Sequence, residues 1–307
     1  MEPVYPLWVS ATVGPVDTPR PYLRIGFFVL GLAAVFAVAV AIGSIVEPAA
    51  TESSEIGETM DAHGPHGSTA MATDEPAGLG ISAGGYTLRL SPTQVGRGEE
   101  RELRFAIEDG AGEPVTGFDE LHERRMHLIV VRRDGAGFRH LHPKIDAAGT
   151  WTAPVSFGAA GVYRVFADFS VAGEQETLAA DLFVSGGEFE AQPFPTPRPV
   201  AETDGYEVEL TAGDAVAGEP AALAFAVSRG GRPVASLQPY LGADGHLVAL
   251  REGDLAFLHV HPEAEYGAAN EILFEATFPT AGRYRLYLQF RHQGEVRTAE
   301  FTVEVPR

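Results

Sequence analysis

Hydrophobic and polar positions alternate with a period of two along most of the chain after residue 85. Over 162–170, for example, Tyr163, Val165 and Ala167 occupy alternate positions, and 284–290 repeats the same pattern. Such alternation is typical of a β-strand that buries one face. No stretch after residue 46 combines a period of 3.6 with capping residues, so the sequence predicts an all-β fold there.

The alternating region is an internal repeat. Tyr86-Thr-Leu-Arg-Leu90 matches Tyr206-Glu-Val-Glu-Leu210 at an offset of 120, and Ala160-Gly-Val-Tyr-Arg164 matches Ala281-Gly-Arg-Tyr-Arg285 at an offset of 121. Offsets that differ so little indicate two copies of one domain of roughly 100 residues.

Seven strands are expected in the first copy, over 86–90, 101–107, 126–133, 136–142, 151–157, 162–170 and 176–184. Seven short strands in roughly 100 residues are typical of an immunoglobulin-like β-sandwich. A Gly-x-Tyr sequence enters the penultimate strand of each copy. Tyr163 and Tyr284 are therefore either tyrosine corners or ordinary aromatic residues of the core.

A long apolar segment precedes the repeats. Residues 25–46 carry no charge and reach roughly 33 Å as a helix, enough to cross a hydrocarbon core. Arg20 and Arg24 come before this segment, whereas the charged residues that follow it are all acidic until Arg89. This asymmetry places the N-terminus in the cytoplasm. A cleaved signal peptide is the competing interpretation, but the span and its 24-residue leader are long for one.

These features divide the chain into six parts. We expect a cytoplasmic tail (1–24), a transmembrane helix (25–46), a disordered acidic tether (47–85), one β-sandwich repeat (86–185), a Pro-rich linker (186–205) and a second repeat (206–307). The predicted fold class is thus two tandem immunoglobulin-like β-sandwich domains preceded by one transmembrane helix. The predicted location is the cell membrane, with a single span and both repeats outside the cytoplasm.

Charge and cysteine content exclude several classes of protein. The 307 residues include 42 acidic and 22 basic side chains, a formal net charge of −20 that repels nucleic acid. The chain has no cysteine, which removes disulfides, thiolate metal sites and a lipid-modified cysteine anchor. The sequence identifies no protein partner.

Histidines follow one pattern, His-x12-His-x-His, in both copies: His127, His140 and His142 in the first, and His246, His259 and His261 in the second. Asp134-Gly135 predicts a type I′ hairpin turn in the first copy, and Gly253-Asp254 suits a type II′ turn in the second. Counting outward from these turns pairs His127 with His142 and His246 with His261. Each trio is then expected on one face of its sheet.

Three imidazoles so placed can converge on one ion. Neutral nitrogens without a thiolate suit Cu(II) or Zn(II), and the fourth ligand would be water or a carboxylate such as Asp244 or Glu263. The alternative is that these histidines are structural residues of a half-exposed face. His63 and His66 in the tether, beside Met60 and Met71, suggest a weaker copper-collecting stretch or simply a solvated linker.

The stretches MHLIVVRRDGAGFRHLHP and YLGADGHLVALREGDLAFLHVHP, each followed by AG-x-Y-R, carry a resemblance. Over 86–305 the chain resembles a family of poorly characterised, membrane-anchored bacterial secreted proteins whose β-sandwich repeats carry HLHP or HVHP signatures. The resemblance implies handling of heavy metals, chiefly copper, by the six histidines named above.

We therefore expect a membrane-anchored metal-binding protein that holds one copper or zinc ion per repeat and is not an enzyme. Two other functions stay open. The first is an immunoglobulin-like interaction or structural module of the cell envelope with no metal. The second is a metal-dependent hydrolase or hydratase, which is disfavoured because the sequence shows no dedicated general base.

Overall fold

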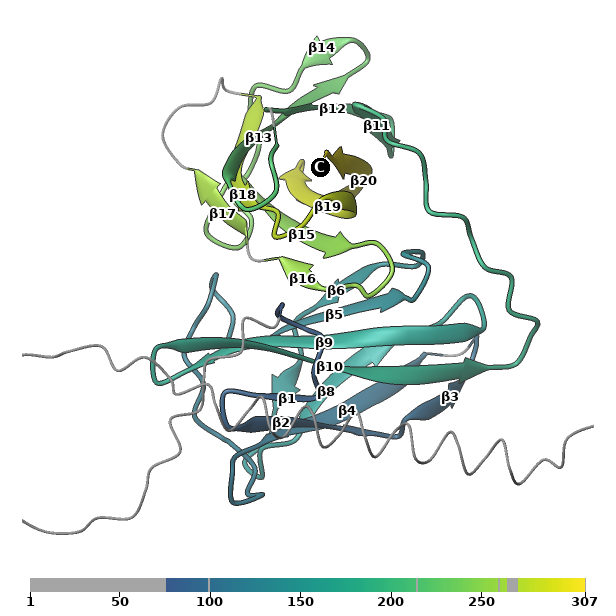
Figure 1. Ribbon diagram of the computed structural model, residues 1–307, viewed down its shortest axis with the longest axis vertical. Helices are drawn as coiled ribbons and strands as arrows, with labels where there is room; N and C mark the ends of the chain where they lie inside the picture. Colours follow the sequence, from purple (N-terminus) through teal and green to yellow (C-terminus); the bar gives the residue numbers. More distant parts are fainter. Residues whose placement is uncertain (1–75, 99, 214, 259, 264–269, 307) are drawn as a thin grey trace, which may run out of the picture. The chain divides into compact units, whose positions relative to one another are not determined.

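The computed structural model describes residues 76–98, 100–213, 215–258, 260–263 and 270–306. All regular elements in these residues are β-strands (Figure 1), as the alternating pattern predicts. None of the described residues forms a helix that could cross a membrane. The expected span over 25–46 lies outside them, as does most of the expected tether.

The first repeat contains two five-stranded sheets. The first sheet has the order β1 (Ser82–Ala83), β2 (Tyr86–Ser91), β4 (Arg101–Glu108), β8 (Trp151–Val155) and β7 (Lys144–Ile145). The second has the order β3 (Gln94–Gly96), β10 (Glu174–Ser185), β9 (Gly161–Val171), β5 (His127–Arg132) and β6 (Arg139–Leu141). All neighbours within the sheets are antiparallel except β3, which runs parallel to β10.

The second repeat has the same plan. Its first sheet has the order β11 (Val200–Thr203), β12 (Tyr206–Ala212), β13 (Pro220–Arg229), β18 (Glu271–Thr277) and β17 (Val260–Glu263), with β14 (Arg232–Pro233) paired to β13. Its second sheet has the order β16 (Phe257–Leu258), β15 (Gly245–Arg251), β19 (Gly282–His292) and β20 (Glu295–Val305).

The strand order is that of an immunoglobulin-like sandwich. Numbered along the first repeat, β2, β4, β8 and β7 take the positions A, B, E and D, and β6, β5, β9 and β10 take C′, C, F and G. The second repeat gives the same sequence of positions. All seven strands predicted in the first copy are present, and β1, β3, β7 and β11 are additional short strands that the sequence pattern did not indicate.

Each repeat has its own core between its two sheets. In the first repeat Trp151 of β8 stacks on Phe105, with ring centroids 6.2 Å apart, and Tyr86 meets Phe169 from the opposite sheet at 5.8 Å. In the second repeat Phe225 of β13 meets Phe301 of β20 at 5.4 Å. Aromatic rings therefore join the two sheets of each repeat in a chain that contains no cysteine.

A third apolar cluster lies between the two repeats. It combines Ile129, Val131, Phe166 and Ala179 from the first repeat with Val248, Leu250, Leu255, Phe257 and Tyr287 from the second. Successive side chains of β5 therefore point to opposite sides. Leu128 and Val130 point into the core of their own repeat, and Ile129 and Val131 point to the other repeat. This explains why all six residues of β5 are buried.

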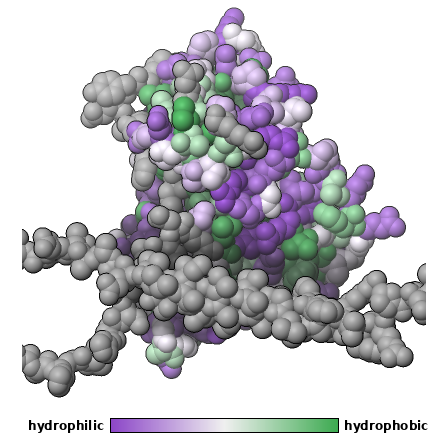
Figure 2. All heavy atoms as spheres, in the orientation of Figure 1, coloured by the Kyte–Doolittle hydropathy of each residue, from purple (hydrophilic) through white to green (hydrophobic). Residues whose placement is uncertain are grey.

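The surface visible in Figure 2 is mainly hydrophilic, with scattered hydrophobic residues among the described atoms. Among the described residues, exposed large hydrophobic side chains are few and come from separate elements, for example Ile81, Phe183 and Val296. The acidic charge of the chain is thus carried on a solvated surface.

Both candidate tyrosines are tyrosine corners. The hydroxyl of Tyr163 donates to the carbonyl of Ala159 at 3.0 Å, and that of Tyr284 donates to the carbonyl of Thr280 at 2.7 Å. In each case the acceptor lies four residues upstream, at the turn that enters strand F. The bond satisfies a hydroxyl on a buried ring and fixes that turn.

Replacing either tyrosine with phenylalanine removes this bond and leaves a carbonyl without its partner. We expect Y163F and Y284F each to lower the free energy of unfolding by about 1 kcal/mol, measured by denaturant titration. Tyr86→Phe is the matched control, because the Tyr86 hydroxyl makes no hydrogen bond among the described residues. Equal effects at all three positions would contradict a special role for the corners.

Candidate metal centre

The first histidine trio comes from one hairpin. His127 begins β5, His140 lies in β6, and His142 follows that strand directly. The ladder pairs Ile129 with His140 and Leu128 with Leu141, which confirms the register predicted from the position of the turn. Because the side-chain period of a strand is two, the three histidines share the face that also carries Ile129.

The turn of this hairpin differs from the prediction. Type I′ needs a positive φ at both central residues, but Asp134 has none and Gly135 has a φ of 79°. The carboxylate of Asp134 instead accepts hydrogen bonds from the Arg132 guanidinium and from the backbone N–H of Ala136. The tip is therefore a wider turn closed by a side chain, and it keeps the predicted register.

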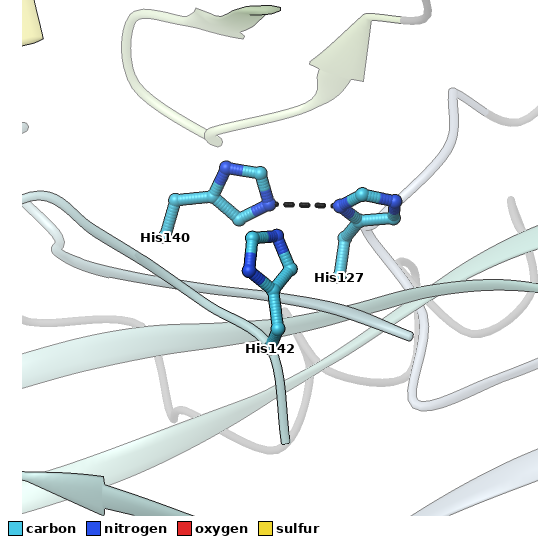
Figure 3. Close-up of side chains that lie close together, drawn as sticks. All are labelled: His127, His140 and His142. Atoms are coloured by element: carbon cyan, nitrogen blue, oxygen red, sulfur yellow. Dashed lines mark hydrogen bonds between the residues drawn. The ribbon is translucent and has the colours of Figure 1, made fainter. Parts of the chain in front are cut away.

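The three imidazoles of the hairpin converge. One nitrogen from each of His127, His140 and His142 lies within 4.8 Å of the other two. Ring centroids are 5.1 Å apart for His127 and His140, 5.3 Å for His127 and His142, and 4.8 Å for His140 and His142. Figure 3 shows the three rings turned toward one another above the sheet.

The rings of His127 and His140 each make one outer hydrogen bond. His127 places Nε2 2.8 Å from the carbonyl of Leu121, so Nε2 carries the proton and donates it. His140 places Nδ1 2.6 Å from the side-chain amide of Gln289, which accepts from Nδ1–H in one orientation and donates to Nδ1 in the other. The remaining nitrogens, Nδ1 of His127 and Nε2 of His140, are hydrogen-bonded to each other at 2.9 Å (Figure 3), and the orientation of Gln289 decides the protonation of this pair.

The third ring lacks a partner of its own. Nε2 of His142 is buried and has no hydrogen-bond partner. An unpartnered polar atom in such a place costs stability unless something satisfies it. The cluster therefore brings one nitrogen of each ring into one small volume, and it leaves Nε2 of His142 without a partner there.

Burial keeps these rings neutral. It lowers the pKa of His127, lowers the pKa of His142 to about 4, and places the pKa of His140 well below the ordinary histidine value, with the neighbouring histidines lowering it further. His127 is only 1% exposed. At neutral pH each of these rings consequently carries a single proton, on one of its two nitrogens.

The second trio is not arranged as the sequence predicted. His246 is the second residue of β15 and shares a face with Val248 and Leu250. Its ring stacks on those of His127 and His140, with centroids 5.5 and 4.7 Å away. His261 belongs to β17 and pairs with Glu275 in the other sheet, so the expected pairing of His246 with His261 is wrong. The hairpin register holds as far as Leu258, after which the chain crosses between sheets.

His259 lies outside the described residues, and only the backbone of His261 is described. A separate site in the second repeat therefore stays a prediction for these two residues. Of the carboxylates suggested as a fourth ligand, Asp244 is exposed in the bend that directly precedes β15.

Two residues of this cluster escaped the sequence analysis. His122 places its ring 6.0 Å from His127 and 5.7 Å from His246. Gln289 is a buried polar residue in β19 that bonds His140. Gln289 lies on the same face of β19 as Tyr287, which meets the other repeat, and the sequence pattern gives no signal for such a contact. Met126 packs in the core, and His292 bonds the Tyr206 hydroxyl, away from the cluster.

The fold and the site define a protein of two immunoglobulin-like domains with a buried histidine cluster where they meet. The chain belongs to the family DUF8832, a domain of unknown function, which matches it twice, over residues 81–186 and 201–307. The repeat in the sequence and the repeat in the fold are therefore two copies of one family domain. A comparison with curated proteins finds no match.

Several solved structures share the sandwich arrangement at low similarity. FdeC, an Escherichia coli adhesin, is 17% identical over 74% of this chain and 65% of its own, with a TM-score of 0.26. InvD of Yersinia pseudotuberculosis is 13% identical over 73% of this chain and 58% of its own, with a TM-score of 0.26. Invasin, a bacterial integrin-binding protein, is 10% identical over 72% and 39%, with a TM-score of 0.22.

The chain thus spans less than two thirds of the length of each of these structures. The strand order described above, rather than these scores, defines the fold.

The lowered histidine pKa values predict how stability depends on pH. Below pH 6.5 the unfolded chain binds protons at these histidines, whereas the folded chain does not, so the free energy of unfolding falls as pH decreases. We expect a loss between pH 6.5 and 5 of up to about 1.4 kcal/mol per pH unit for each such histidine. Denaturant titration in the presence of a chelator measures it.

His142→Gln provides the comparison, because it removes one titrating ring from the cluster. Its free energy of unfolding should fall less steeply over the same pH range. A wild-type stability that stays constant or rises between pH 6.5 and 5 would show that the rings are not held neutral.

Proposed function

We propose that this protein binds one transition-metal ion, Cu(II) or Zn(II), through His127, His140 and His142. In this proposal the segment 25–46 anchors the chain in a membrane and both repeats lie outside the cytoplasm, where the site binds or sequesters metal. The proposal requires no catalytic step.

The observation that carries the proposal is the direction of the outer hydrogen bonds. Histidines that bind metals almost always donate their other ring N–H to a carbonyl, a carboxylate or water, which fixes the tautomer. His127 does so to the carbonyl of Leu121, and His140 does so to Gln289. With His140 donating in this way, Nδ1 of His127 and Nε2 of His140, which lie 2.9 Å apart beside His142, would supply lone pairs to the ion.

The size of the site suits such an ion. Tetrahedral coordination with bonds of about 2.0–2.1 Å places ligand nitrogens about 3.3 Å apart. The pair of His127 and His140, now 2.9 Å apart, would open by a few tenths of an ångström, and the widest pair would close from no more than 4.8 Å. Changes of this size need only small rotations of the imidazole rings.

One buried carboxylate beside the site favours a cation. Asp168 lies opposite His127 in the ladder between β5 and β9 and is only 6% exposed. Its carboxylate favours positive charge at His127, against the opposing effects of His122 and Arg124. Three neutral nitrogens without thiolate are the donor set that Cu(II) and Zn(II) accept.

A second function rests on a different orientation of one amide. If the Gln289 NH2 donates to Nδ1 of His140, then His140 Nε2–H donates to His127 and His127 donates to Leu121, all as neutral groups. The cluster would then be a hydrogen-bonded contact between the repeats. The protein would be an immunoglobulin-like structural or interaction module without metal.

Metal uptake by the full-length chain separates the two functions. Because His63 and His66 are themselves candidate copper ligands, the background for this experiment carries H63A and H66A. We expect equilibrium dialysis against a competing chelator to find one Zn(II) or Cu(II) bound at the cluster. Loss of an outer hydrogen-bond partner alone costs about 10–100-fold in affinity, so H127A and H140A should each cost more than about 100-fold.

His292→Gln is the matched control, since this histidine lies away from the cluster, and it should leave the affinity unchanged. The pair H259A and H261A should leave the ion at the cluster in place. If the wild-type chain takes up no ion, or if H127A and H140A bind as tightly as the wild type, the metal proposal fails and the structural module remains.

A further inference from the structure

The second repeat contributes two residues to the histidine cluster of the first. Gln289 of β19 bonds His140, and His246 of β15 stacks on His127 with an interplanar angle of 11°. His246 and Gln289 are directly paired in the ladder between β15 and β19, so they lie side by side on one face of the second repeat. His246 is partly buried, and Gln289 is only 6% exposed.

The apolar contact between the repeats places Gln289 beside the trio, because residues of the two repeats meet there at equivalent steps along the chain. Phe138, which directly precedes β6, stacks on Tyr287 of β19, with ring centroids 4.0 Å apart and an interplanar angle of 7°. His140 and Gln289 each lie two residues further along the chain, so they face each other one step beyond the aromatic pair. The Tyr287 hydroxyl also donates to the carbonyl of Gly135 at 2.6 Å, which fixes the register of the two strands.

A similar correspondence holds for the neighbouring strands. In β5, His127 precedes Ile129 and Val131, and in β15, His246 precedes Val248 and Leu250 at the same spacing. The apolar members of both strands belong to the cluster between the repeats, and the two histidines stack at its edge. Docking of the repeats therefore brings His246 and Gln289 to the trio together.

We infer that the metal site is shared between the repeats, with Gln289 as a positioning residue that holds the tautomer of His140 and His246 as the ring that closes the site from the second repeat. This inference rests on the proposed function. It means that the ion links the two domains, and that the chain holds one site at their junction rather than one in each.

Such a site couples metal binding to docking of the repeats. If docking raises the affinity for the ion by some factor, the ion must favour the docked arrangement by the same factor. Metal concentration would then control how firmly the two domains are held together, which offers a way for the protein to respond to metal.

Substitutions of Gln289 test the positioning role in the full-length chain carrying H63A and H66A. Gln289→Leu has a similar volume but accepts no hydrogen bond, so we expect the Cu(II) affinity to fall about 10–100-fold and the Cu(II) electron paramagnetic resonance spectrum to change. Gln289→Glu keeps an acceptor at the same place, so it should bind within a few-fold of the wild type with a similar spectrum.

The rescue by glutamate separates positioning from a purely structural contact. A contact that needs the amide NH2 as donor would be lost in Q289E as in Q289L, because an ionised carboxylate cannot donate. Equal losses in the two variants would therefore overturn the positioning role.

Amide hydrogen exchange tests the coupling directly. Adding Zn(II) should slow exchange in β15 and β16 of the second repeat as well as in β5 and β6, and H246A should reduce the protection seen in the second repeat. His292→Gln is again the control and should behave as the wild type.

The outcomes distinguish this inference from the proposed function. If H127A and H140A abolish binding while Q289L and H246A bind as the wild type, with zinc protecting only the first repeat, the shared site is wrong and the metal site in the first repeat stands. If the wild-type chain binds no ion at the cluster, both are wrong.

Discussion

The packing of one apolar strand face from each repeat against the other determines where the chemistry of this protein lies. Ile129 and Val131 meet Val248 and Leu250 across the junction of the repeats. The contact buries both faces of β5, which an isolated sandwich would leave partly in water. The burial of the histidine cluster has the same cause, because the rings lie on this same face of β5 and the docking of the repeats covers them.

Burial gives the cluster its chemical character. Imidazoles removed from water stay neutral, and the outer nitrogens are hydrogen-bonded to the carbonyl of Leu121 and the side chain of Gln289. The inner nitrogens of His127 and His140 lie 2.9 Å apart beside His142. In the proposed metal site these nitrogens bind one cation, because burial disfavours an additional proton on the rings.

Much of the fold could be predicted from the sequence, because local patterns carry it. The period of two and the internal repeat correctly indicated the seven strands and the sandwich. The Gly-x-Tyr sequences left two alternatives open for Tyr163 and Tyr284, and the structure shows that both are corners. The hairpin register also followed from the position of Asp134-Gly135, even though the turn type did not, since a carboxylate closes a wider turn.

The site was only partly predictable, because its second half comes from a different domain. Spacing along one hairpin brought His127, His140 and His142 together correctly. The same spacing in the second repeat failed at His261, because the chain leaves for the other sheet after Leu258. Two apolar faces on β5 were the sequence signal for the junction, but they do not say which surface covers them. The contact of Gln289 with His140 and that of His122 with His246 form only when the two repeats dock.

Nitrogen-15 NMR of the histidine side chains, recorded with and without Zn(II), reports which ring nitrogen carries a proton or a metal. With zinc, we expect His127 to be protonated at Nε2 and bound through Nδ1, and His140 to be protonated at Nδ1 and bound through Nε2. A spectrum that zinc leaves unchanged, with His140 protonated at Nε2 and donating to His127, would rule out metal binding by these two rings.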